Sequence, residues 1–234
     1  TRTEALMKRV CFHKVTLLDF PGLVACTVFV GGCNFRCPFC HNADVVEEST
    51  GGEFSEEEIL SYLTKRKGVL DGVCITGGEP LLFPGILGFM RRIKDLGFKI
   101  KLDTNGSIPS RLKEAVLGGL CDYVAMDIKN ALEKYPLTAG VKTDNEKIKE
   151  SVDFLLSGAV PYEFRTTVVK ELHTKDDILK ISEEISGAAK WYLQQFVDSG
   201  NLIGSGFSAY PPSELEEFAA AARKNIPETF VRGI

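Results

Sequence analysis

The segment ACTVFVGGCNFRCPFC, residues 25–40, contains the features that decide the fold and the chemistry of this chain. Its first six residues are almost wholly apolar, which is typical of a strand buried on both faces of a parallel sheet. The two glycines that follow permit a tight loop, because glycine adopts backbone conformations that other residues avoid. The loop carries Cys33, Cys37 and Cys40, spaced C-x3-C-x2-C. We therefore expect three thiols in one loop at the end of a core strand.

Three thiols in one loop are compatible with an iron–sulfur cluster, a zinc ion or a disulfide. Each iron of a four-iron cluster takes one thiolate, so three cysteines leave one iron open to a small molecule. Zinc prefers four ligands, and His41 could complete a Cys3His set, but the adjacent side chains of Cys40 and His41 cannot easily point at one metal. A disulfide needs an oxidising compartment, which nothing in the sequence indicates. The spacing therefore favours the cluster.

The remaining cysteines form no second C-x2-C pair, so we expect no second cluster. Cys26 and Cys74 lie in apolar strand patterns, and Cys121 lies just before one. These positions are typical of buried cysteines that pack as small apolar residues.

The composition indicates one large globular domain. The chain has 234 residues, 44% of them hydrophobic and 26% charged, which is enough for a sizeable core. The net charge of −4 gives no reason to expect nucleic acid or an anionic membrane as a partner. No apolar run approaches the length of a membrane span, and residues 1–10 lack the apolar region of a secretory signal. We therefore expect a cytoplasmic protein.

Apolar strand patterns alternate with helix patterns along the chain. The expected strands are residues 25–30, 72–76, 99–102, 123–128, 163–169 and 191–197. The expected helices begin near Ser55, Ile86, Ser110, Thr143, Thr174 and Ser213, and capping boxes open those at Ser55, Thr143, Thr174 and Ser213. We expect a loop over residues 42–53 and surface positions for His13 and His173.

Strand–helix alternation of this kind produces a parallel sheet with helices outside it. Six units are fewer than the eight of a closed barrel. We therefore expect an α/β fold, an open partial (β/α)6 barrel, with a doubly wound open sheet as the alternative. Residues 1–22 are expected to form an N-terminal extension with a short strand or hairpin arm, and residues 23–234 a single barrel domain.

Polar motifs follow the strands rather than the helices. They are the cysteine loop, Gly77-Gly78-Glu79, Asp103-Thr104-Asn105, Asp127-Ile128-Lys129 and residues 194–198. Binding sites in parallel barrels and open sheets are built at the carboxyl ends of the strands. The sequence therefore predicts that these five motifs meet at one site, which is not expected of a structural zinc protein.

The motifs resemble those of the radical S-adenosylmethionine (SAM) superfamily, in which C-x3-C-x-aromatic-C precedes a GGEP sequence, here at residues 77–80. Residues 32–42, LDTNG at 102–106 and DIK at 127–129 are similar to the activating enzymes of glycyl-radical enzymes. Residues 16–22 and 191–196 are most similar to the activating proteins of anaerobic ribonucleotide reductases. The resemblance covers nearly the whole chain and implies the open partial (β/α)6 barrel of the radical SAM type.

The resemblance also implies two cofactors, a [4Fe–4S] cluster and SAM. Cys33, Cys37 and Cys40 would hold three irons, and SAM would chelate the fourth iron through its amino and carboxylate groups. No catalytic residue is implied beyond these cluster ligands. The residues expected to contact SAM are Phe39, Cys40, His41, Gly77, Gly78, Glu79, Thr104, Asp127, Lys129, Arg165 and Gln195.

The expected roles follow from the same resemblance. Residues 77–79 would hold the methionine end of SAM. Asp127 and Lys129 alternate along a strand end and so face one side. They would bind the ribose hydroxyls and the carboxylate, with a solvated ion pair as the alternative. Arg165 lies in an apolar strand and needs an anionic partner, either SAM or an interior acid.

Three further residues carry weaker signals. Phe39 would cover the adenine or shield the cluster from water. Thr104 belongs to a sequence that is also an ordinary turn. Gln195 stands where a related activating enzyme has a histidine, so the last strand departs from the family pattern.

The function implied is that of an activase. A 5′-deoxyadenosyl radical from SAM would remove a hydrogen atom from the Cα of one glycine in a partner enzyme. The expected partner is the large subunit of an anaerobic ribonucleoside-triphosphate reductase, with a pyruvate formate-lyase type enzyme as the alternative. The expected electron donor is a low-potential flavodoxin or ferredoxin. Two competing hypotheses are a radical SAM enzyme that acts on a small molecule and a zinc-stabilised interaction module.

Overall fold

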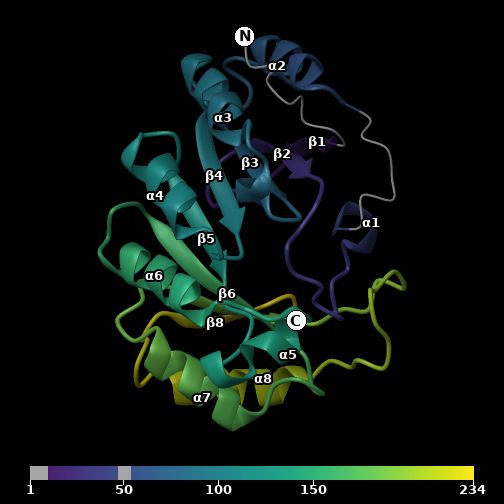
Figure 1. Cartoon of the computed structure of the whole chain (residues 1–234), viewed down its shortest axis with the longest axis vertical. Helices are drawn as coiled ribbons and strands as arrows, with labels where there is room; N and C mark the ends of the chain where they lie inside the picture. The colour runs from purple at the N-terminus through teal and green to yellow at the C-terminus, as the bar shows by residue number, and fades with distance from the viewer. Residues whose placement is uncertain (1–9, 47–53) are drawn as a thin grey trace. The chain divides into compact units, whose positions relative to one another are not determined.

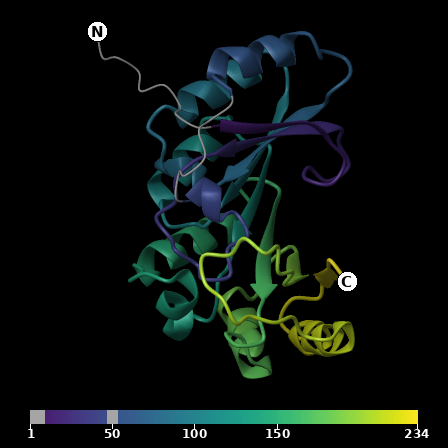
Figure 2. The same ribbon diagram turned by 90° about the vertical axis from the view of Figure 1, so that its right-hand side faces the viewer.

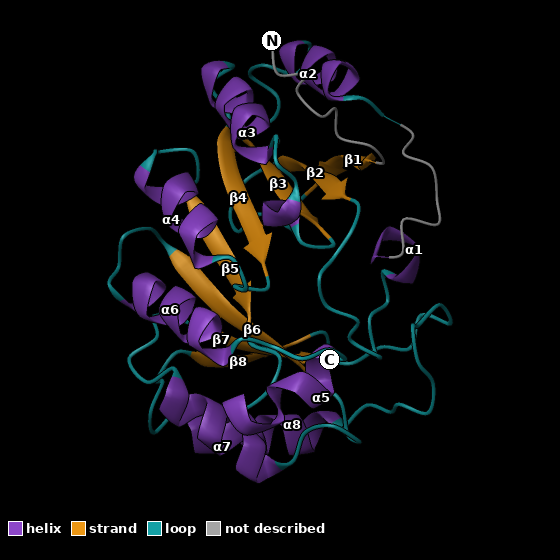
Figure 3. Ribbon diagram, in the orientation of Figure 1, coloured by secondary structure: helices purple, strands orange, loops and turns teal. Residues whose placement is uncertain are grey.

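The computed structural model describes residues 10–46 and 54–234 of the chain. Eight strands form one mostly parallel sheet, in which they follow each other in chain order and which is not closed (Figures 1 and 3). The expectation of an open α/β partial barrel is therefore confirmed. A doubly wound sheet would require the strand order to reverse, and it does not.

Most of the expected elements are present, with small shifts at their ends. The strands are β1 (Val10–Thr16), β2 (Ala25–Val30), β3 (Gly72–Gly77), β4 (Lys99–Thr104), β5 (Tyr123–Asp127), β6 (Tyr162–Val168), β7 (Trp191–Gln195) and β8 (Thr229–Arg232). The helices are α1 (Ala43–Val46), α2 (Glu56–Thr64), α3 (Ile86–Asp95), α4 (Pro109–Leu117), α5 (Tyr135–Ala139), α6 (Asn145–Leu156), α7 (Lys175–Glu184) and α8 (Pro212–Ala222).

The chain divides into two compact units. The first is Thr1–Asn34, Asp44–Thr104 and Ser110–Val124, and the second is Phe35–Ala43, Asn105–Pro109 and Ala125–Ile234. Each unit contains part of the sheet and has its own buried side chains. The expected division into an N-terminal extension and one barrel domain stays a prediction, and residues 1–9 of that extension lie outside the described part of the chain.

In the first unit, β1 pairs with β2 in the antiparallel direction, as expected of a hairpin arm (Figure 2). β2, β3 and β4 are parallel, and Ala25 is in register with Gly72. The side chains of Cys26 and Val28 in β2 are fully buried, as the apolar run predicts. Helices α2 and α3 pack beside each other (Figure 1).

The expectation of a loop over residues 42–53 is only partly correct. Residues Ala43–Val46 form the short helix α1, and residues 47–53 lie outside the described residues. Val46 of this helix is buried, and the carbonyl of Val45 accepts a hydrogen bond from Gly32 N–H at 2.9 Å. A tertiary contact with the cysteine loop therefore holds a turn of helix that has no periodic signal in the sequence.

In the second unit, β6, β7 and β8 are parallel, and α7 and α8 lie side by side (Figure 2). The sequence did not predict β8 or α5. Both are short, with four and five residues, so neither offers a full period of the patterns that predict strands and helices.

Two of the four expected capping boxes are present, at Ser55 with Glu58 and at Thr174 with Asp177. The other two are wrong. The hydroxyl of Thr143 donates to the side chain of Asn145 at 2.7 Å instead of capping α6. α8 begins one residue before Ser213, at a proline whose fixed φ suits the first helical position.

No helix in the described residues combines the length and the apolar character that crossing a membrane requires.

Candidate functional site

In the first unit, the cysteine loop and the GGE motif (residues 77–79) begin at the ends of neighbouring strands, at the same register position. Val30, the last residue of β2, is in register with Gly77, the last residue of β3. Beyond this pair, Gly78 N–H donates to the Val30 carbonyl and Glu79 N–H donates to the Gly32 carbonyl, each at 2.9 Å. The loop that begins the cysteine motif is therefore bonded directly to the GGE motif.

The glycines of the GGE motif are required by this close approach. Gly77 has φ of +115°, and a Cβ added there would lie 2.5 Å from the Val30 carbonyl oxygen. A Cβ added to Gly78 would lie 1.9 Å from the Gly32 carbonyl oxygen. No side chain fits either position, which explains the glycine pair without reference to a ligand.

Glu79 and Thr104 form a buried pair in the same unit. The carboxylate of Glu79 is fully buried, and its Oε1 accepts hydrogen bonds from Leu81 N–H at 3.0 Å and from the Thr104 hydroxyl at 2.9 Å. Thr104, at the end of β4, is itself buried. The sequence predicted separate SAM contacts for these two residues, and the structure joins them.

The cysteine loop continues into the second unit, which contains Cys37 and Cys40. Cys40 N–H donates to the Cys37 carbonyl at 3.0 Å, which places both residues on one turn. Burial raises the pKa of the Cys37 thiol, and the Lys129 ammonium opposes that shift. The Phe39 side chain is buried, whereas His41 is exposed. Burial of Phe39 agrees with a shielding role as well as with a ligand contact.

Helix α5 supports this turn. Arg36 N–H donates to the Ala139 carbonyl at 2.8 Å, and the rings of Phe35 and Tyr135 meet edge to face at 6.4 Å. Gly140 ends α5 with φ of +69°, and a Cβ there would lie 2.0 Å from the Arg36 carbonyl oxygen. The helix and the cysteine loop are thus packed backbone to backbone.

The donor set of the three loop cysteines fits an iron–sulfur cluster, since soft thiolates are its ligands. No disulfide joins the cysteines of the described residues. The same residues contain no group of three or more His, Cys, Asp and Glu side chains already arranged to hold a metal ion. Cys33 belongs to the first unit, whereas Cys37 and Cys40 belong to the second. The assignment of one iron to each cysteine therefore stays a prediction.

The strand end of β5 carries a charge cluster of Asp127, Lys129 and Arg165. Oδ1 of Asp127 accepts from Nε of Arg165 at 2.9 Å, and Oδ2 accepts from Nζ of Lys129 at 3.0 Å. Burial alone would raise the pKa of Asp127, but the Arg165 and Lys129 cations outweigh it and hold that pKa well below its usual range. Arg165 thus pairs with an interior acid, one of the two partners expected for it. The cluster carries a net charge of +1 and suits an anionic group such as a carboxylate.

Gln195 ends β7 and has one unsatisfied atom. Its Nε2 donates to the Tyr210 carbonyl at 3.1 Å, while Oε1 is buried and has no hydrogen-bond partner within the described residues. A buried carbonyl oxygen without a donor is destabilising, so this amide oxygen is suited to accept a hydrogen bond from a ligand.

Sequence reasoning missed His173 at this site. The expectation of a surface position is confirmed for His13, which is exposed, and wrong for His173, whose side chain is fully buried. His173 Nε2 lies 2.8 Å from the Lys129 carbonyl oxygen. Its place after the end of β6 is the signal that could have found it, because the other candidate residues follow strands too. The prediction that all five motifs meet at one site stays a prediction.

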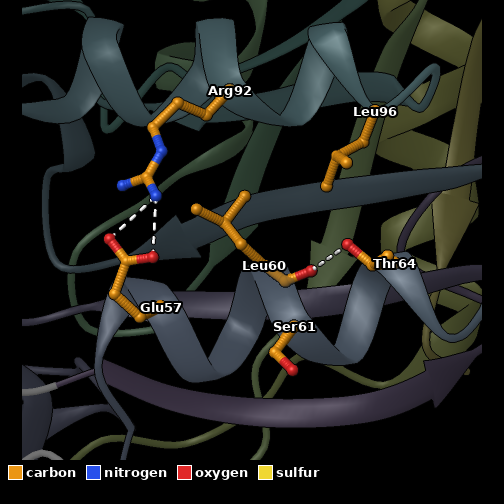
Figure 4. A pocket seen from close by; sticks show the side chains of 6 residues that line it. All are labelled: Glu57, Leu60, Ser61, Thr64, Arg92 and Leu96. Atoms are coloured by element: carbon orange, nitrogen blue, oxygen red, sulfur yellow. Dashed lines mark hydrogen bonds and ion pairs between the residues drawn. The ribbon is translucent and has the colours of Figure 1, made fainter.

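The pocket in Figure 4 is lined by residues of helices, not by the strand-end residues described above. It encloses about 310 Å³ on the outer side of the first unit, between α2 and α3. Arg92 of α3 bonds both carboxylate oxygens of Glu57 at 2.8 Å across it. The pocket contains no cysteine, histidine or strand-end motif, and this ion pair neutralises its charges, so we assign it no chemistry. Its lining residues are Glu57, Leu60, Ser61, Thr64, Arg92 and Leu96.

Comparison with known proteins places the chain in a family. Residues 27–185 match the model of the radical SAM superfamily. The chain is 31% identical over 228 residues to a protein of Methanocaldococcus jannaschii that bears the provisional name of a glycyl-radical enzyme activating enzyme, and the match covers 94% of this chain and 93% of that protein. It is 28% identical over 194 residues to the pyruvate formate-lyase-activating enzyme of Listeria monocytogenes, covering 78% and 77% of the two chains.

A solved structure supports the fold. The crystal structure of SuiB from Streptococcus suis superposes with a TM-score of 0.68 at 12% identity, over 87% of this chain and 47% of SuiB. The match to the superfamily model and the relative at 31% identity show that the chain belongs to the radical SAM superfamily. It is an enzyme of the oxidoreductase type whose cofactors are a [4Fe–4S] cluster and SAM, and its relatives include activating enzymes of glycyl-radical enzymes.

Proposed function

We propose that this chain is an activating enzyme that generates a glycyl radical on a partner enzyme. The observation that carries the proposal is the match of nearly full length to the M. jannaschii protein named for this activity. Pyruvate formate-lyase-activating enzymes among the relatives support the same class of reaction.

Three cysteines and several strand-end residues would hold the cofactors. Cys33, Cys37 and Cys40 would each bind one iron of the cluster. When bound and reduced, the cluster supplies one electron to the sulfonium of SAM, which yields methionine and a 5′-deoxyadenosyl radical that takes a hydrogen atom from the substrate. The glycine Cα–H bond breaks and the C5′–H bond of 5′-deoxyadenosine forms, so the unpaired electron is left on the partner.

The chain's own residues would bind and orient SAM. The charge cluster around Asp127 carries a net positive charge, which supports binding of the SAM carboxylate by Lys129. The unsatisfied Oε1 of Gln195 supports a hydrogen bond from a donor group of the ligand. Glu79 is held by Thr104 and Leu81 N–H in a fixed orientation, which supports a role for this carboxylate at the cationic amino group of SAM.

We propose the large subunit of an anaerobic ribonucleoside-triphosphate reductase as the partner. The proposal rests on residues 16–22 and 191–196, whose sequence resembles the activating proteins of those reductases. We propose a low-potential flavodoxin or ferredoxin as the electron donor, because a single low-potential electron must reach the cluster for each SAM cleaved.

The experiment mixes the anaerobically reconstituted, reduced protein with SAM and the reductase subunit, and records electron paramagnetic resonance spectra. A glycyl radical is expected to give a doublet, because the unpaired electron couples to the one remaining α-hydrogen. The doublet is expected to collapse to a singlet when that hydrogen is deuterium. A doublet on a pyruvate formate-lyase alone would correct the partner and keep the chemistry. Equally fast formation of 5′-deoxyadenosine with and without a partner, with no doublet on either enzyme, would refute the activase and favour a small-molecule substrate.

Two variants test the binding residues separately. Asp127→Ala and Glu79→Ala are expected to retain iron and sulfide but to bind SAM more weakly. Unchanged SAM affinity in both variants would show that these strand ends do not bind SAM.

A further inference from the structure

We propose that His173 is a positioning residue for SAM, which fixes the strand end of β5 by donating a hydrogen bond from Nε2 to the main-chain carbonyl of Lys129. This inference rests on the proposed function, in which Asp127 and Lys129 bind SAM. It adds a residue that no motif contains, and it assigns a buried histidine that the sequence placed on the surface.

At the end of β5, side chains donate hydrogen bonds to three successive main-chain carbonyls, while Ile128 N–H donates to the Arg165 carbonyl of β6 at 2.8 Å. The Asp127 carbonyl accepts from the hydroxyl of Tyr135 at 3.3 Å, and the Ile128 carbonyl accepts from the hydroxyl of Thr166 at 2.9 Å. The Lys129 carbonyl accepts from His173 at 2.8 Å. Three successive carbonyls are thus fixed by three buried side chains, one from α5, one from β6 and one from the loop after β6.

The side chain that follows is held as well. Asn130 is fully buried, and its Nδ2 donates to Thr138 Oγ1 at 2.8 Å and to the Leu172 carbonyl at 3.0 Å. Buried main-chain polar groups are normally paired, with other main-chain groups or with side chains. Here the partners belong to α5 on one side and to β6 and the loop after it on the other. The backbone of residues 127–130 therefore cannot rotate without breaking several hydrogen bonds.

Geometry and burial together indicate a neutral His173 that carries its hydrogen on Nε2. Nε2 lies 2.8 Å from a carbonyl oxygen, so Nε2 carries a hydrogen. Nδ1 lies 3.1 Å from the Val169 nitrogen and 3.2 Å from the Val169 carbonyl oxygen, and a neutral ring that carries its hydrogen on Nε2 accepts at Nδ1 from Val169 N–H. Burial lowers the pKa of His173, which keeps the ring neutral near pH 7. The Tyr210 hydroxyl donates to the His173 carbonyl at 2.8 Å, so the histidine's own backbone is held too.

The position of the Lys129 carbonyl controls the position of the Lys129 side chain. Lys129 Nζ pairs with Asp127 Oδ2, and both groups belong to the charge cluster that would face the carboxylate of SAM. Loss of the hydrogen bond to His173 would release one carbonyl of this segment while leaving both charged side chains in the protein. We therefore expect weaker SAM binding without loss of the ligand groups themselves.

Two conservative variants separate the two hydrogen bonds of the ring. The amide nitrogen of glutamine reaches about as far as Nε2, so His173→Gln keeps a donor for the Lys129 carbonyl. The side chain of asparagine reaches only as far as Nδ1, so His173→Asn keeps an acceptor for Val169 N–H and loses the donor. The matched control is Thr229→Val. It removes a different buried side-chain donor of the second unit, the Thr229 hydroxyl, which donates to the Ile226 carbonyl at 2.7 Å.

The experiment measures the dissociation constant of SAM by anaerobic equilibrium dialysis with the reconstituted holoenzyme, together with iron content and the melting temperature. His173→Asn is expected to weaken SAM binding roughly five- to tenfold, the loss of about one hydrogen bond. His173→Gln is expected to restore SAM binding to within about twofold of the wild type. Thr229→Val is expected to lower the melting temperature and leave SAM binding unchanged.

Asp127→Asn, measured in parallel, separates failure of this inference from failure of the proposed function. If Asp127→Asn weakens SAM binding and His173→Asn does not, His173 is a structural histidine and the inference is wrong. If His173→Asn and His173→Gln weaken SAM binding equally, the donor to Lys129 is not the cause, and the inference is also wrong. If Asp127→Asn binds SAM as the wild type does, the assigned SAM site fails and the inference fails with it.

Discussion

Replacement of Thr104 by valine tests whether this residue contacts SAM or positions Glu79. Valine has nearly the same shape as threonine but no hydroxyl, so the change removes the donor to Glu79 Oε1 and little packing. Glu79 is fully buried, and Oε1 would keep a hydrogen bond from Leu81 N–H but lose the one from the side chain. Because the carboxylate is buried, water cannot replace the hydrogen-bond donor that it loses.

The magnitude follows from the charge and burial of this pair. A hydrogen bond to a charged group contributes about 1.5–3 kcal/mol to stability. Thr104 and Glu79 are both buried, so we apply this whole range to their hydrogen bond. For a chain of this size, 1 kcal/mol corresponds to roughly 2–4 °C in melting temperature. We therefore expect Thr104→Val to lower the melting temperature of the protein without SAM by about 3–12 °C.

The assay is thermal unfolding of the protein without SAM, followed by circular dichroism, with Thr104→Ser as the control. Serine keeps the hydroxyl and loses one methyl group, so it should unfold closer to the wild type than valine does. If the valine variant has the same melting temperature as the wild type and only its SAM affinity falls, Thr104 is a direct ligand of SAM. In that case the buried pair with Glu79 does not stabilise the protein.

Three other predictions follow from the same contacts. Gly140→Ala should destabilise the protein by more than about 1 kcal/mol relative to Gly158→Ala. Both glycines have positive φ, but only at Gly140 does a main-chain carbonyl occupy the place of the new Cβ. Equal urea midpoints for the two variants would contradict the close contact with the cysteine loop. His173 has a lowered pKa in the folded protein, so as the pH is lowered through the ordinary value of 6.5 the unfolded chain binds more protons than the folded chain, and the free energy of unfolding decreases as the pH falls. His173→Gln should flatten this dependence between pH 7 and pH 5, and an unchanged slope would show that His173 is not buried. Burial raises the pKa of Cys26 and of Cys121 to about 12, so iodoacetamide at pH 8 should leave both thiols unmodified until the protein is unfolded, as mass spectrometry of tryptic peptides can show.

The sequence predicted the parts of the fold that are long and periodic. Residues 25–30 were predicted as a buried strand, and β2 has these bounds because an uninterrupted apolar run of this length fits a strand covered on both faces. Thr174 was predicted as a helix cap because its hydroxyl and Asp177 interact over only three residues. Local chemistry of this kind depends little on the rest of the chain.

The rest depends on contacts between distant residues, which no local pattern contains. Helix α5 has five residues and is defined by its contacts with the cysteine loop and the end of β5. His173 is buried because its ring spans two main-chain segments, 4 and 44 residues away in sequence. The expected cap at Thr143 failed for a local reason, because that hydroxyl donates to the side chain of Asn145, two residues along the chain. The candidate ligands were therefore predictable, and the residues that position them were not.

Under the proposed function, this chain transfers a hydrogen atom from a glycine of another protein to the C5′ atom derived from SAM. The most direct measurement uses a partner reductase subunit produced with glycine deuterated at Cα, mixed anaerobically with the reduced protein and unlabelled SAM. Mass spectrometry should find one deuterium in each 5′-deoxyadenosine formed, in step with the glycyl radical. If the 5′-deoxyadenosine carries no deuterium while the partner's glycine remains intact, the chain is not an activating enzyme of this partner.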